Sequence, residues 1–581
     1  MLPPPLPASA FRLRLRFHRR EFIVPTLTPT ADVYGAYPLL SDDQIAILRP
    51  CGQVRPVREG EHLFRAGDPS EEFFVVLSGT VAVVDGHGEQ EKVVHLHDAH
   101  SFLGELGVLE GQTALLSAVV STPGEVLTVG LAALRDLLSR EPALGDVILR
   151  AYLLRRTMLA GAGTGFRIIG SAFSPDTRRL LDFAARNRLP HRWADLEKDT
   201  EAEALLTRLG IAPEDTPIVV WHEHRVLRNP SNAELAQVIG LRTGTVARAV
   251  FDLMVVGAGP GGLAAAVYGA SEGLSTVVLD AVATGGQAAT SSRIENYLGF
   301  PAGISGMELA ECAVVQATRF GARITVPAEA AGLEQRDGAN VVRLADGSTV
   351  AANNVVVATG ARYRRLTARG VERFEGFGVH YAATLWEART CRLDAVAVVG
   401  GGNSAGQAAL FMARESPAVH LLVRGGDLDH SMSRYLIDRI EQNPRIHVRL
   451  HTEVQEVTGE DRVEAVVVQD NRTREQQVLD ARALFVFIGA RPATSWLAGA
   501  LTLDPRGFIP TGQDVAHVAA DLWKPLGRAP LALETGLPGV FAVGDVRSGS
   551  VKRVASAVGE GAMAVRLAHE HLEEVRPSVI R

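Results

Sequence analysis

Two glycine-rich turns in this sequence have the residue types and spacing to bind a nucleotide diphosphate. The first is Gly257-Ala258-Gly259-Pro260-Gly261-Gly262, which follows a predicted strand at 253–256 and opens a predicted helix. In such a turn the first glycine allows the tight bend, the second lets backbone approach a pyrophosphate, and the third lets helix pack on strand. The next predicted strand, 276–279, ends in Asp280, 18 residues past the turn, which suits a ribose hydroxyl.

The second turn, Gly400-Gly401-Gly402-Asn403-Ser404-Ala405, follows a predicted strand at 395–399. Its small Ala405 stands where a third glycine is usual, which the pattern permits. The following predicted strand, 419–423, ends in Arg424 rather than in an acid. A cation there suits the 2′-phosphate of NADP, and Arg434 is a second candidate for that pocket. The alternative for both arginines is a solvated surface position.

One turn is followed by an acidic strand end and the other by a basic one, which indicates two different nucleotides. FAD at the first turn and NADPH at the second is the economical interpretation. The sequence thus predicts a protein that carries a hydride from nicotinamide to flavin.

The chain has three cysteines, Cys51, Cys312 and Cys391, which lie far apart in the sequence. No CxxC or zinc-ligand spacing exists, and a disulfide framework is excluded. We expect a reduced, cytoplasmic setting and no metal site.

The hydrophobic pattern of the sequence changes along the chain and predicts different elements in different ranges. Residues 38–130 show short alternating apolar runs, typical of a small antiparallel barrel or jelly roll, and 131–160 have helical spacing. Residues 166–243 alternate predicted strands and helices, and βαβ patterns run from Phe251 onward. A length of 581 residues agrees with about four domains.

Charge and hydropathy exclude some classes of protein. The net charge of −7 gives no global basic field for nucleic acid. No run of about 18–20 apolar residues predicts a membrane-spanning helix. We expect residues 1–37 to be a disordered extension; the alternative is a basic amphipathic arm around Phe11–Phe17.

Residues 251–575 resemble the low-molecular-weight thioredoxin reductase family, part of the pyridine nucleotide-disulfide oxidoreductases. The motifs that carry the resemblance are Gly285-Gly286-Gln287, Ile294 to Pro301, Val355 to Gly360, Val540 to Val546, and Lys552 to Ala555 with Gly559 to Gly561. The resemblance implies that Asp545 lies on the ribityl chain and that a helix start near Val554 faces the flavin ring. Fingerprints and resemblance together predict these cofactor-binding residues: Gly257, Gly259, Pro260, Gly261, Gly262, Asp280, Gly285, Gly286, Gln287, Asn296, Ala358, Thr359, Gly360, Gly400, Gly402, Asn403, Ser404, Ala405, Arg424, Arg434, Gly544, Asp545, Lys552, Arg553, Val554 and Ala555.

The resemblance also implies an FAD domain split into 251–365 and 488–575, with an NAD(P)H domain at 366–487 between them. The family places a redox Cys-x-x-Cys just before the second fingerprint. Here Ala382 and Leu385 occupy those positions, so a dithiol relay there is chemically impossible. Cys391 lies six residues later, and its ordinary role would be packing. The catalytic residues therefore stay unknown at this point.

Residues 38–160 resemble a cyclic nucleotide-binding domain, through Arg58 to Asp68 and Phe102 to Leu109. The resemblance puts Glu105 at the ribose and an arginine at the cyclic phosphate, but Ala114 stands at the arginine position. Losing a charge-assisted pair to phosphate makes cyclic nucleotide binding doubtful. A degenerate, structural or dimerising domain is the preferred interpretation.

Residues 166–243 resemble a thioredoxin or glutaredoxin fold. Ser174 and Thr177 stand where a CxxC would be, and Thr216-Pro217 matches the cis-proline signature of that fold. Such a module either holds a partner segment or serves as a docking spacer. The predicted fold is thus multidomain: a β-barrel, a thioredoxin-like α/β domain, and two nested Rossmann-like domains.

Three functional hypotheses remain open. The first is an FAD-dependent NAD(P)H oxidoreductase that passes electrons to a small-molecule or redox-protein acceptor. The second is a thioredoxin-disulfide reductase that uses a partner's thiols. The third is a non-enzymatic flavin- and nucleotide-binding sensor. The resemblance further implies a homodimer.

Overall fold

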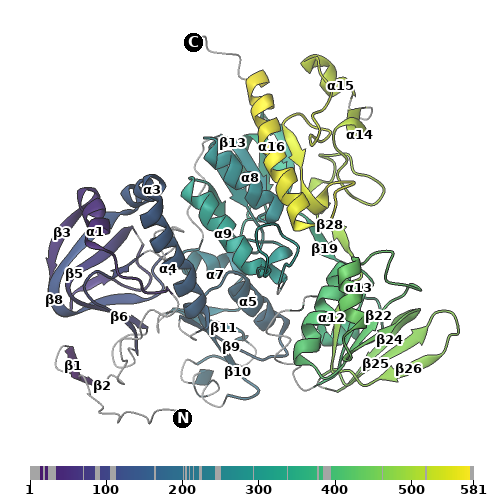
Figure 1. Cartoon of the computed structure of the whole chain (residues 1–581), viewed down its shortest axis with the longest axis horizontal. Helices are drawn as coiled ribbons and strands as arrows, with labels where there is room; N and C mark the ends of the chain where they lie inside the picture. Colours follow the sequence, from purple (N-terminus) through teal and green to yellow (C-terminus); the bar gives the residue numbers. More distant parts are fainter. Residues whose placement is uncertain are drawn as a thin grey trace. The chain divides into compact units, whose positions relative to one another are not determined.

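The computed structural model describes residues 14–17, 20–23 and 35–575 except for some internal segments (Figure 1). Those segments are 70, 86–91, 105–112, 162–164, 200–201, 203, 205, 208–209, 213–214, 222–224, 242–249, 292, 337, 376–377, 382, 384–393, 461 and 517–519. The chain forms two compact units, mainly residues 1–245 and mainly 246–581, and each is described by itself.

The first part of unit 1 is an antiparallel sheet in the order β3-β8-β5-β6, with β4 on β8 and β7 on β5. Its strands are β3 (Gly52–Val57), β4 (His62–Phe64), β5 (Glu72–Asp85), β6 (Lys92–His97), β7 (Phe102–Leu103) and β8 (Ser117–Gly130). The long strands β5 and β8 pair along their lengths, and their apolar residues Phe74, Val76 and Val120 form a buried core. The alternating pattern of the sequence thus correctly indicated an antiparallel sheet here.

Three helices accompany this sheet: α1 (Asp42–Leu48), α3 (Leu131–Arg140) and α4 (Pro142–Gly161). The helical run predicted at 131–160 is broken at Glu141, whose φ of −115° and ψ of 79° are not helical. Pro142 is the reason, because a proline disfavours the helical conformation of the residue before it. It then occupies the first position of α4, where its missing N–H costs nothing.

The expected N-terminal extension, residues 1–37, lies mostly outside the described residues. Within it β1 (Arg14–Phe17) pairs antiparallel with β2 (Arg20–Ile23). The last residues of the extension pack against the domain that follows. Ala36 is buried, and the Tyr37 ring stacks on His95 with centroids 3.5 Å apart.

The second part of unit 1 is a four-stranded sheet in the order β10-β9-β11-β12. Its elements are β9 (Phe166–Gly170), α5 (Pro175–Arg186), β10 (His191–Asp195), β11 (Ile218–Trp221), β12 (Arg225–Arg228) and α7 (Asn232–Val238). β9 pairs parallel with β10 and antiparallel with β11, and the peptide bond before Pro217 is cis. The edge strand β12 begins and ends with arginine, so its sequence lacks a clear apolar strand pattern.

Unit 2 contains a sheet in the order β15-β14-β13-β18-β17-β16, with β29 beside β18. Its strands are β13 (Phe251–Val256), β14 (Thr276–Leu279), β15 (Arg323–Thr325), β16 (Ala330–Arg336), β17 (Ala339–Leu344), β18 (Thr349–Val357) and β29 (Val540–Ala542), and its long helices are α8 (Pro260–Ser271), α9 (Gly306–Arg319) and α16 (Val554–Val575). β29 pairs parallel with β18, Val540 opposite Val355, so two distant stretches of chain share one sheet. Helices α8 and α16 pack side by side (Figure 1).

A second parallel sheet, β20-β27-β21-β22-β23, lies between these stretches in the sequence. Its strands are β20 (Val379–His380), β21 (Val396–Val399), β22 (Val419–Leu422), β23 (Ile446–Arg449) and β27 (Ala483–Val486), accompanied by α12 (Asn403–Glu415) and α13 (Arg434–Glu441). A separate antiparallel sheet consists of β24 (Thr452–Thr458), β25 (Ala465–Asp470) and β26 (Gln476–Leu479). The strands β19 (Ala361–Tyr363) and β28 (Ala490–Pro492) pair where the chain enters and leaves this inserted part.

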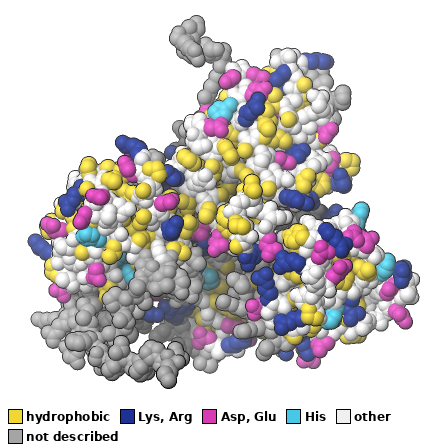
Figure 2. Space-filling model, viewed as in Figure 1, with side chains coloured by type: hydrophobic (Ala, Val, Ile, Leu, Met, Phe, Trp, Pro, Cys, Tyr) yellow, Lys and Arg dark blue, Asp and Glu magenta, His cyan; other side chains and the backbone are white. Residues whose placement is uncertain are grey.

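The surface of unit 2 carries both signs of charge. On the face in Figure 2, Lys and Arg side chains alternate with Asp and Glu over the part that contains β22 to β26. Within the described residues, no helix combines the length and the apolar character needed to cross a membrane.

Candidate functional site

The first glycine turn joins β13 to α8 and requires its glycines. Gly257 has a φ of +107°, and a Cβ there would lie 2.3 Å from the carbonyl oxygen of Ala358. Gly259 is the N-cap of α8, and no side chain caps that helix end. Pro260 follows at the first helical positions. The first amides of α8 therefore point out of the helix without a side-chain acceptor, which is the arrangement that binds a phosphate.

A second loop lies directly against this turn. A Cβ on Gly286 would be 3.0 Å from the Cα of Gly259, and the amide of Gly285 donates to the carbonyl of Ala258 at 2.7 Å. The side-chain amide of Gln287 donates to the carbonyl of Ala361. The structure thus brings Gly285, Gly286 and Gln287 together with the first fingerprint, and the glycines leave a backbone-lined cradle that a dinucleotide fits.

Asp280, predicted to reach a ribose, also braces this turn. Its Oδ2 accepts from the amide of Ala258 at 2.8 Å, and its Oδ1 accepts from the amides of Val282 at 2.9 Å and Ala283 at 3.0 Å. The Asp280 carboxylate therefore accepts from at least three backbone amides of this loop region. The ribose contact stays a prediction, and the bracing role was missed from sequence.

The end of β18 connects the two stretches of the flavin-side domain. Ala358 faces Gly257, while the hydroxyl of Thr359 donates to the carbonyl of Ala493 at 2.8 Å. The amide of Ala493 in turn donates to the carbonyl of Gly360 at 3.0 Å. Asn296 is exposed and stays a predicted contact only.

The segment that the sequence predicts to close the flavin site lies directly after β29. The Asp545 side chain is half-buried, and burial raises the pKa of its carboxyl. The nearby Glu560 raises this pKa further, whereas Lys552 lowers it. A partly desolvated carboxyl at this place has hydrogen-bonding capacity to offer to a ligand hydroxyl.

Glu560, which was not among the predicted site residues, supports this segment. Its Oε2 accepts from the amide of Gly544 at 2.6 Å, and its Oε1 accepts from Arg547 at 2.6 Å and from the Ser550 hydroxyl at 2.9 Å. Glu560 therefore fixes the loop that carries Asp545. The signal in the sequence was the adjacent Gly561, which lets α16 approach α8 closely.

The start of α16 is confirmed at Val554, so Lys552 and Arg553 precede the helix and Ala555 lies in its first turn. A Cβ on Gly561 would lie 2.2 Å from the carbonyl oxygen of Gly261 in α8. These two glycines allow the backbones of α8 and α16 to touch, and the start of α16 is held near the first fingerprint as a result.

The second glycine turn joins β21 to α12 and has the same features as the first. Gly400 has a φ of +141°, and a Cβ there would be 2.4 Å from the carbonyl oxygen of Phe487. Gly402 is the N-cap of α12 without a side-chain cap, and Ala405 is fully buried, as a glycine substitute should be. The side chain of Asn403 accepts from the amide of Ser433 at 2.6 Å, whereas Ser404 is exposed. Asn403 thus holds a neighbouring loop.

The two candidate arginines differ in their surroundings. Arg424 is exposed at the end of β22, and its carbonyl accepts from Asn471 at 3.0 Å. Arg434 lies 2.8 Å from Asp438 and 3.4 Å from Asp429, and these carboxylates raise the pKa of its guanidinium. Arg434 is therefore engaged by acids near it in sequence, whereas a phosphate contact of Arg424 stays a prediction.

The predicted dithiol positions, Ala382 and Leu385, and also Cys391 and Glu105, lie outside the described residues. Cys312 is exposed on α9, and Cys51 is partly buried. Ala114, at the position of the phosphate-binding arginine, is buried.

Ser174 and Thr177, the other thiol-equivalent positions, serve a structural purpose. The hydroxyl of Ser174 accepts from the amide of Thr177 at 3.3 Å and caps α5. Thr177 is fully buried. The residues that stand in for thiols therefore start and pack this helix.

Two families of known proteins match different parts of this chain. The profile of the pyridine nucleotide-disulphide oxidoreductases matches residues 251–561, and that of the cyclic nucleotide-binding domain matches residues 54–141. Thioredoxin reductase of Treponema pallidum is 33% identical over 56% of this chain and 98% of its own. Thioredoxin reductase of Mycolicibacterium smegmatis is 31% identical over 55% of this chain and 96% of its own.

Solved structures give the same result. Thioredoxin reductase of Lactococcus lactis matches 56% of this chain and 99% of its own with a TM-score of 0.50 at 27% identity. That of T. acidophilum has the same coverage and TM-score at 29% identity. Proteins of this kind use FAD and NADPH, and the two uncapped glycine turns fit these cofactors. The chain thus belongs to the pyridine nucleotide-disulphide oxidoreductase family, as a thioredoxin reductase-like, FAD-dependent NAD(P)H oxidoreductase with an added cyclic nucleotide-binding domain.

Proposed function

We propose that this protein moves a hydride from NADPH to FAD and then passes electrons to an acceptor other than a dithiol of its own. The observation that carries the proposal is the cysteine content. Cys51, Cys312 and Cys391 include no pair at redox spacing, and Ala382 and Leu385 replace the family's two thiols. Neither replacement can form a thiolate, so electrons must leave by another route.

In this proposal the chain's own residues bind and orient the cofactors. FAD supplies a ring system that accepts a hydride from NADPH. The amides at the start of α8 bind the pyrophosphate, Asp545 holds the ribityl chain, and Arg424 binds the 2′-phosphate. The start of α16 faces the flavin ring, where its dipole stabilises negative charge.

The domain limits belong to the same proposal. The FAD domain comprises 251–365 and 488–575, and the NADPH domain comprises 366–487. The antiparallel pair β19–β28 supports these limits, because the chain passes from one part to the other and back at these two strands. We further propose that one domain rotates against the other during hydride transfer, and that the protein is a homodimer.

The module at 166–243 is proposed to be thioredoxin-like. The topology supports this proposal. β9 and β10 pair parallel, β11 pairs antiparallel with both β9 and β12, and α5 connects β9 to β10. With Ser174 and Thr177 in place of thiols, it would dock a redox partner without exchanging electrons with it. A partner that brings its own thiols is therefore the second candidate acceptor.

Two experiments on the full chain test this proposal. Anaerobic mixing with NADPH should bleach the flavin absorbance. Steady-state NADPH oxidation should then be supported by a quinone or ferricyanide, and much less by an aromatic disulfide such as 5,5′-dithiobis(2-nitrobenzoate). An unchanged flavin spectrum would refute hydride transfer itself.

Two matched variants address the thiols directly. Cys391→Ser and Cys312→Ser should both keep full quinone reductase turnover, since neither thiol lies in a relay. Rapid disulfide reduction that disappears in Cys391→Ser alone would contradict the proposal and favour a dithiol mechanism.

A further inference from the structure

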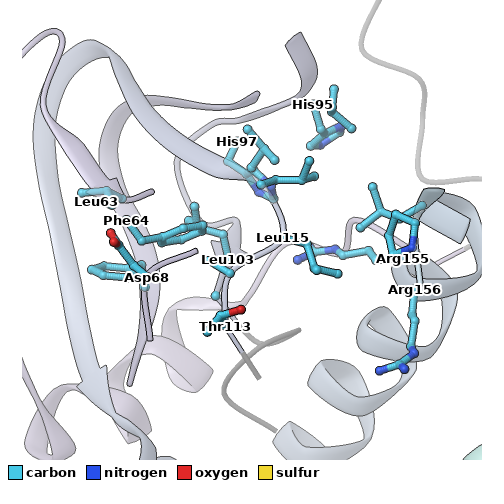
Figure 3. Close-up of a pocket in the computed structure, with 18 of the residues that line it drawn as sticks. Leu63, Phe64, Asp68, His95, His97, Leu103, Thr113, Leu115, Arg155 and Arg156 are labelled. Atoms are coloured by element: carbon cyan, nitrogen blue, oxygen red, sulfur yellow. The ribbon is translucent and has the colours of Figure 1, made fainter. Parts of the chain in front are cut away.

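A cavity of about 270 Å³ lies in unit 1 between the antiparallel sheet, α4 and residues 188–190 (Figure 3). Most of its wall is apolar, and Leu63, Phe64, Leu103, Leu115 and Leu116 are among the lining residues. An apolar cavity of about 150 Å³ holds benzene, so this one has room for roughly two fused rings or a medium acyl chain.

One end of the cavity wall carries two buried polar side chains, His97 and Arg155. His97 is only 3% exposed, and its Nδ1 has no hydrogen-bond partner among the described residues. Burial, and secondarily the charge of Arg155, holds the pKa of His97 well below its ordinary value, so its imidazole is neutral and one nitrogen can donate. A buried polar atom of this kind is costly to leave unsatisfied, which points to a ligand.

Arg155 supplies a fixed positive charge beside His97. It is 4% exposed; its Nε donates to the carbonyl of Ala36 at 2.7 Å and its Nη1 to that of Phe102 at 3.0 Å. Its guanidinium also lies over the rings of Tyr37 and Phe102, 4.8 and 4.6 Å from their centroids. Two carbonyls and two rings therefore hold this cation at the cavity wall.

The charges on the cavity wall are separated. Arg155 and Arg156 lie on one side in Figure 3, whereas Asp68 lies on the other with Leu63 and Phe64. Glu71 and Glu72, also lining residues, are exposed. A ligand with one acidic group would place it at the arginine side and its apolar body along the leucines.

A cyclic nucleotide fits this wall poorly. Ala114, Leu115 and Leu116 lie side by side in the lining, where the related domain needs an arginine for the cyclic phosphate. A phosphate against these side chains would lose hydration without gaining a charged partner. The same side chains favour a hydrocarbon or aromatic body.

We propose that this cavity binds a small apolar carboxylic acid, with its carboxylate at His97 and Arg155 and its apolar body against Leu103, Leu115 and Leu116. Two kinds of ligand have this combination of a carboxylate and an apolar body: an aromatic acid and a fatty acid of medium length. The site is independent of the flavin chemistry proposed above.

Isothermal titration of the full chain tests the proposal, with 2-naphthoate and decanoate as the two acids. Their neutral counterparts, 2-naphthalenemethanol and decan-1-ol, and cyclic AMP complete the set. At least one acid should bind at least tenfold more tightly than its alcohol, because a charge-assisted hydrogen bond is lost with the carboxylate. The preferred acid identifies the kind of ligand.

Variants locate the site. His97→Leu should weaken acid binding at least fivefold and leave alcohol binding within about twofold. The control His100→Asn, in the same part of unit 1 but outside the cavity lining, should change neither. Ala114→Phe fills the cavity and should abolish binding of both. NADPH oxidation by each variant should match the wild type, which reports that the chain is folded.

Three results would overturn the proposal: equal affinity for acids and alcohols, tighter binding of cyclic AMP than of either acid, or acid binding that survives Ala114→Phe. If His97→Leu fails to fold, Ala114→Phe together with the acid-to-alcohol comparison still decides the question.

Discussion

The Oδ2 of Asp280 accepts a hydrogen bond of 2.8 Å from the amide of Ala258, the residue between the first two glycines of the flavin-side turn. This contact ties the end of β14 to the turn after β13, its parallel neighbour. A single carboxylate therefore sets the shape of the loop whose amides would bind the pyrophosphate, besides any contact with ribose.

Replacing Asp280 by alanine should remove an acceptor from three backbone amides. We expect a loss of about 1–3 kcal/mol in the free energy of unfolding and protein that purifies with little flavin. Denaturant titration and the ratio of flavin to protein absorbance measure both. Asp346→Ala, which removes an exposed turn carboxylate bonded to Ser348, is the matched control and should retain flavin. Full flavin content in Asp280→Ala would show that the brace is dispensable.

The Arg424→Glu variant should shift coenzyme preference toward NADH. Loss of a charge-assisted contact with the 2′-phosphate, together with new repulsion, should lower kcat/KM for NADPH by at least tenfold. The value for NADH should change little. Arg434→Gln is the control, because Asp438 and Asp429 already engage that guanidinium. An unchanged NADPH-to-NADH ratio in Arg424→Glu would exclude the assigned role.

Replacing the Asp545 carboxyl should have opposite effects on flavin binding and on the stability of the apoprotein. Because burial raises its pKa above the ordinary 3.8, the folded apoprotein disfavours the charged form. The stability that this group contributes is present below that value and is lost as the pH rises through the folded pKa. Asp545→Asn should therefore melt at a higher temperature than wild type as apoprotein at pH 7, and the gain should shrink toward pH 4.

The same variant should bind flavin weakly, since the ribityl contact loses a charged acceptor. Thermal melts of flavin-free protein at several pH values, with flavin titration beside them, separate the two effects. Asp514→Asn, at an exposed carboxylate, is the control. Tight flavin binding by Asp545→Asn would contradict the assigned contact.

Two glycines on α16 should respond in opposite ways to alanine. A Cβ at Gly561 would meet the carbonyl oxygen of Gly261 at 2.2 Å, so Gly561→Ala should push α16 from α8 and cost about 1–3 kcal/mol. A Cβ at Gly559 meets nothing within 4 Å, so Gly559→Ala should stabilise the helix by up to about 1 kcal/mol. Denaturant unfolding of both variants tests this, and equal effects would argue against close helix packing.

Much of the flavin- and nucleotide-binding part was predictable from sequence, because its signals are local. Gly257 and Gly400 adopt positive φ next to a carbonyl, and only glycine suits that geometry. The strand, turn and helix order around each is fixed by short-range hydrophobic patterns, so the strands expected at 253–256 and 395–399 are found as β13 and β21, each followed by a helix. Helix boundaries were less predictable. The helical pattern of 131–160 suggested one helix, but Pro142 divides it into α3 and α4.

The sequence by itself determined that the chain carries two nucleotide turns with an acidic and a basic strand end, and no cysteine pair. Only the tertiary structure decided which of the candidate side chains already bind other parts of the protein. It placed Arg434 among carboxylates, put the Asp280 oxygens on three amides, and gave Glu560 a supporting role. It also joined His97, Arg155 and Leu115, which are far apart in the chain, around one cavity. The physical reason is that partners and burial depend on packing between distant segments, which residue types and spacing do not encode locally.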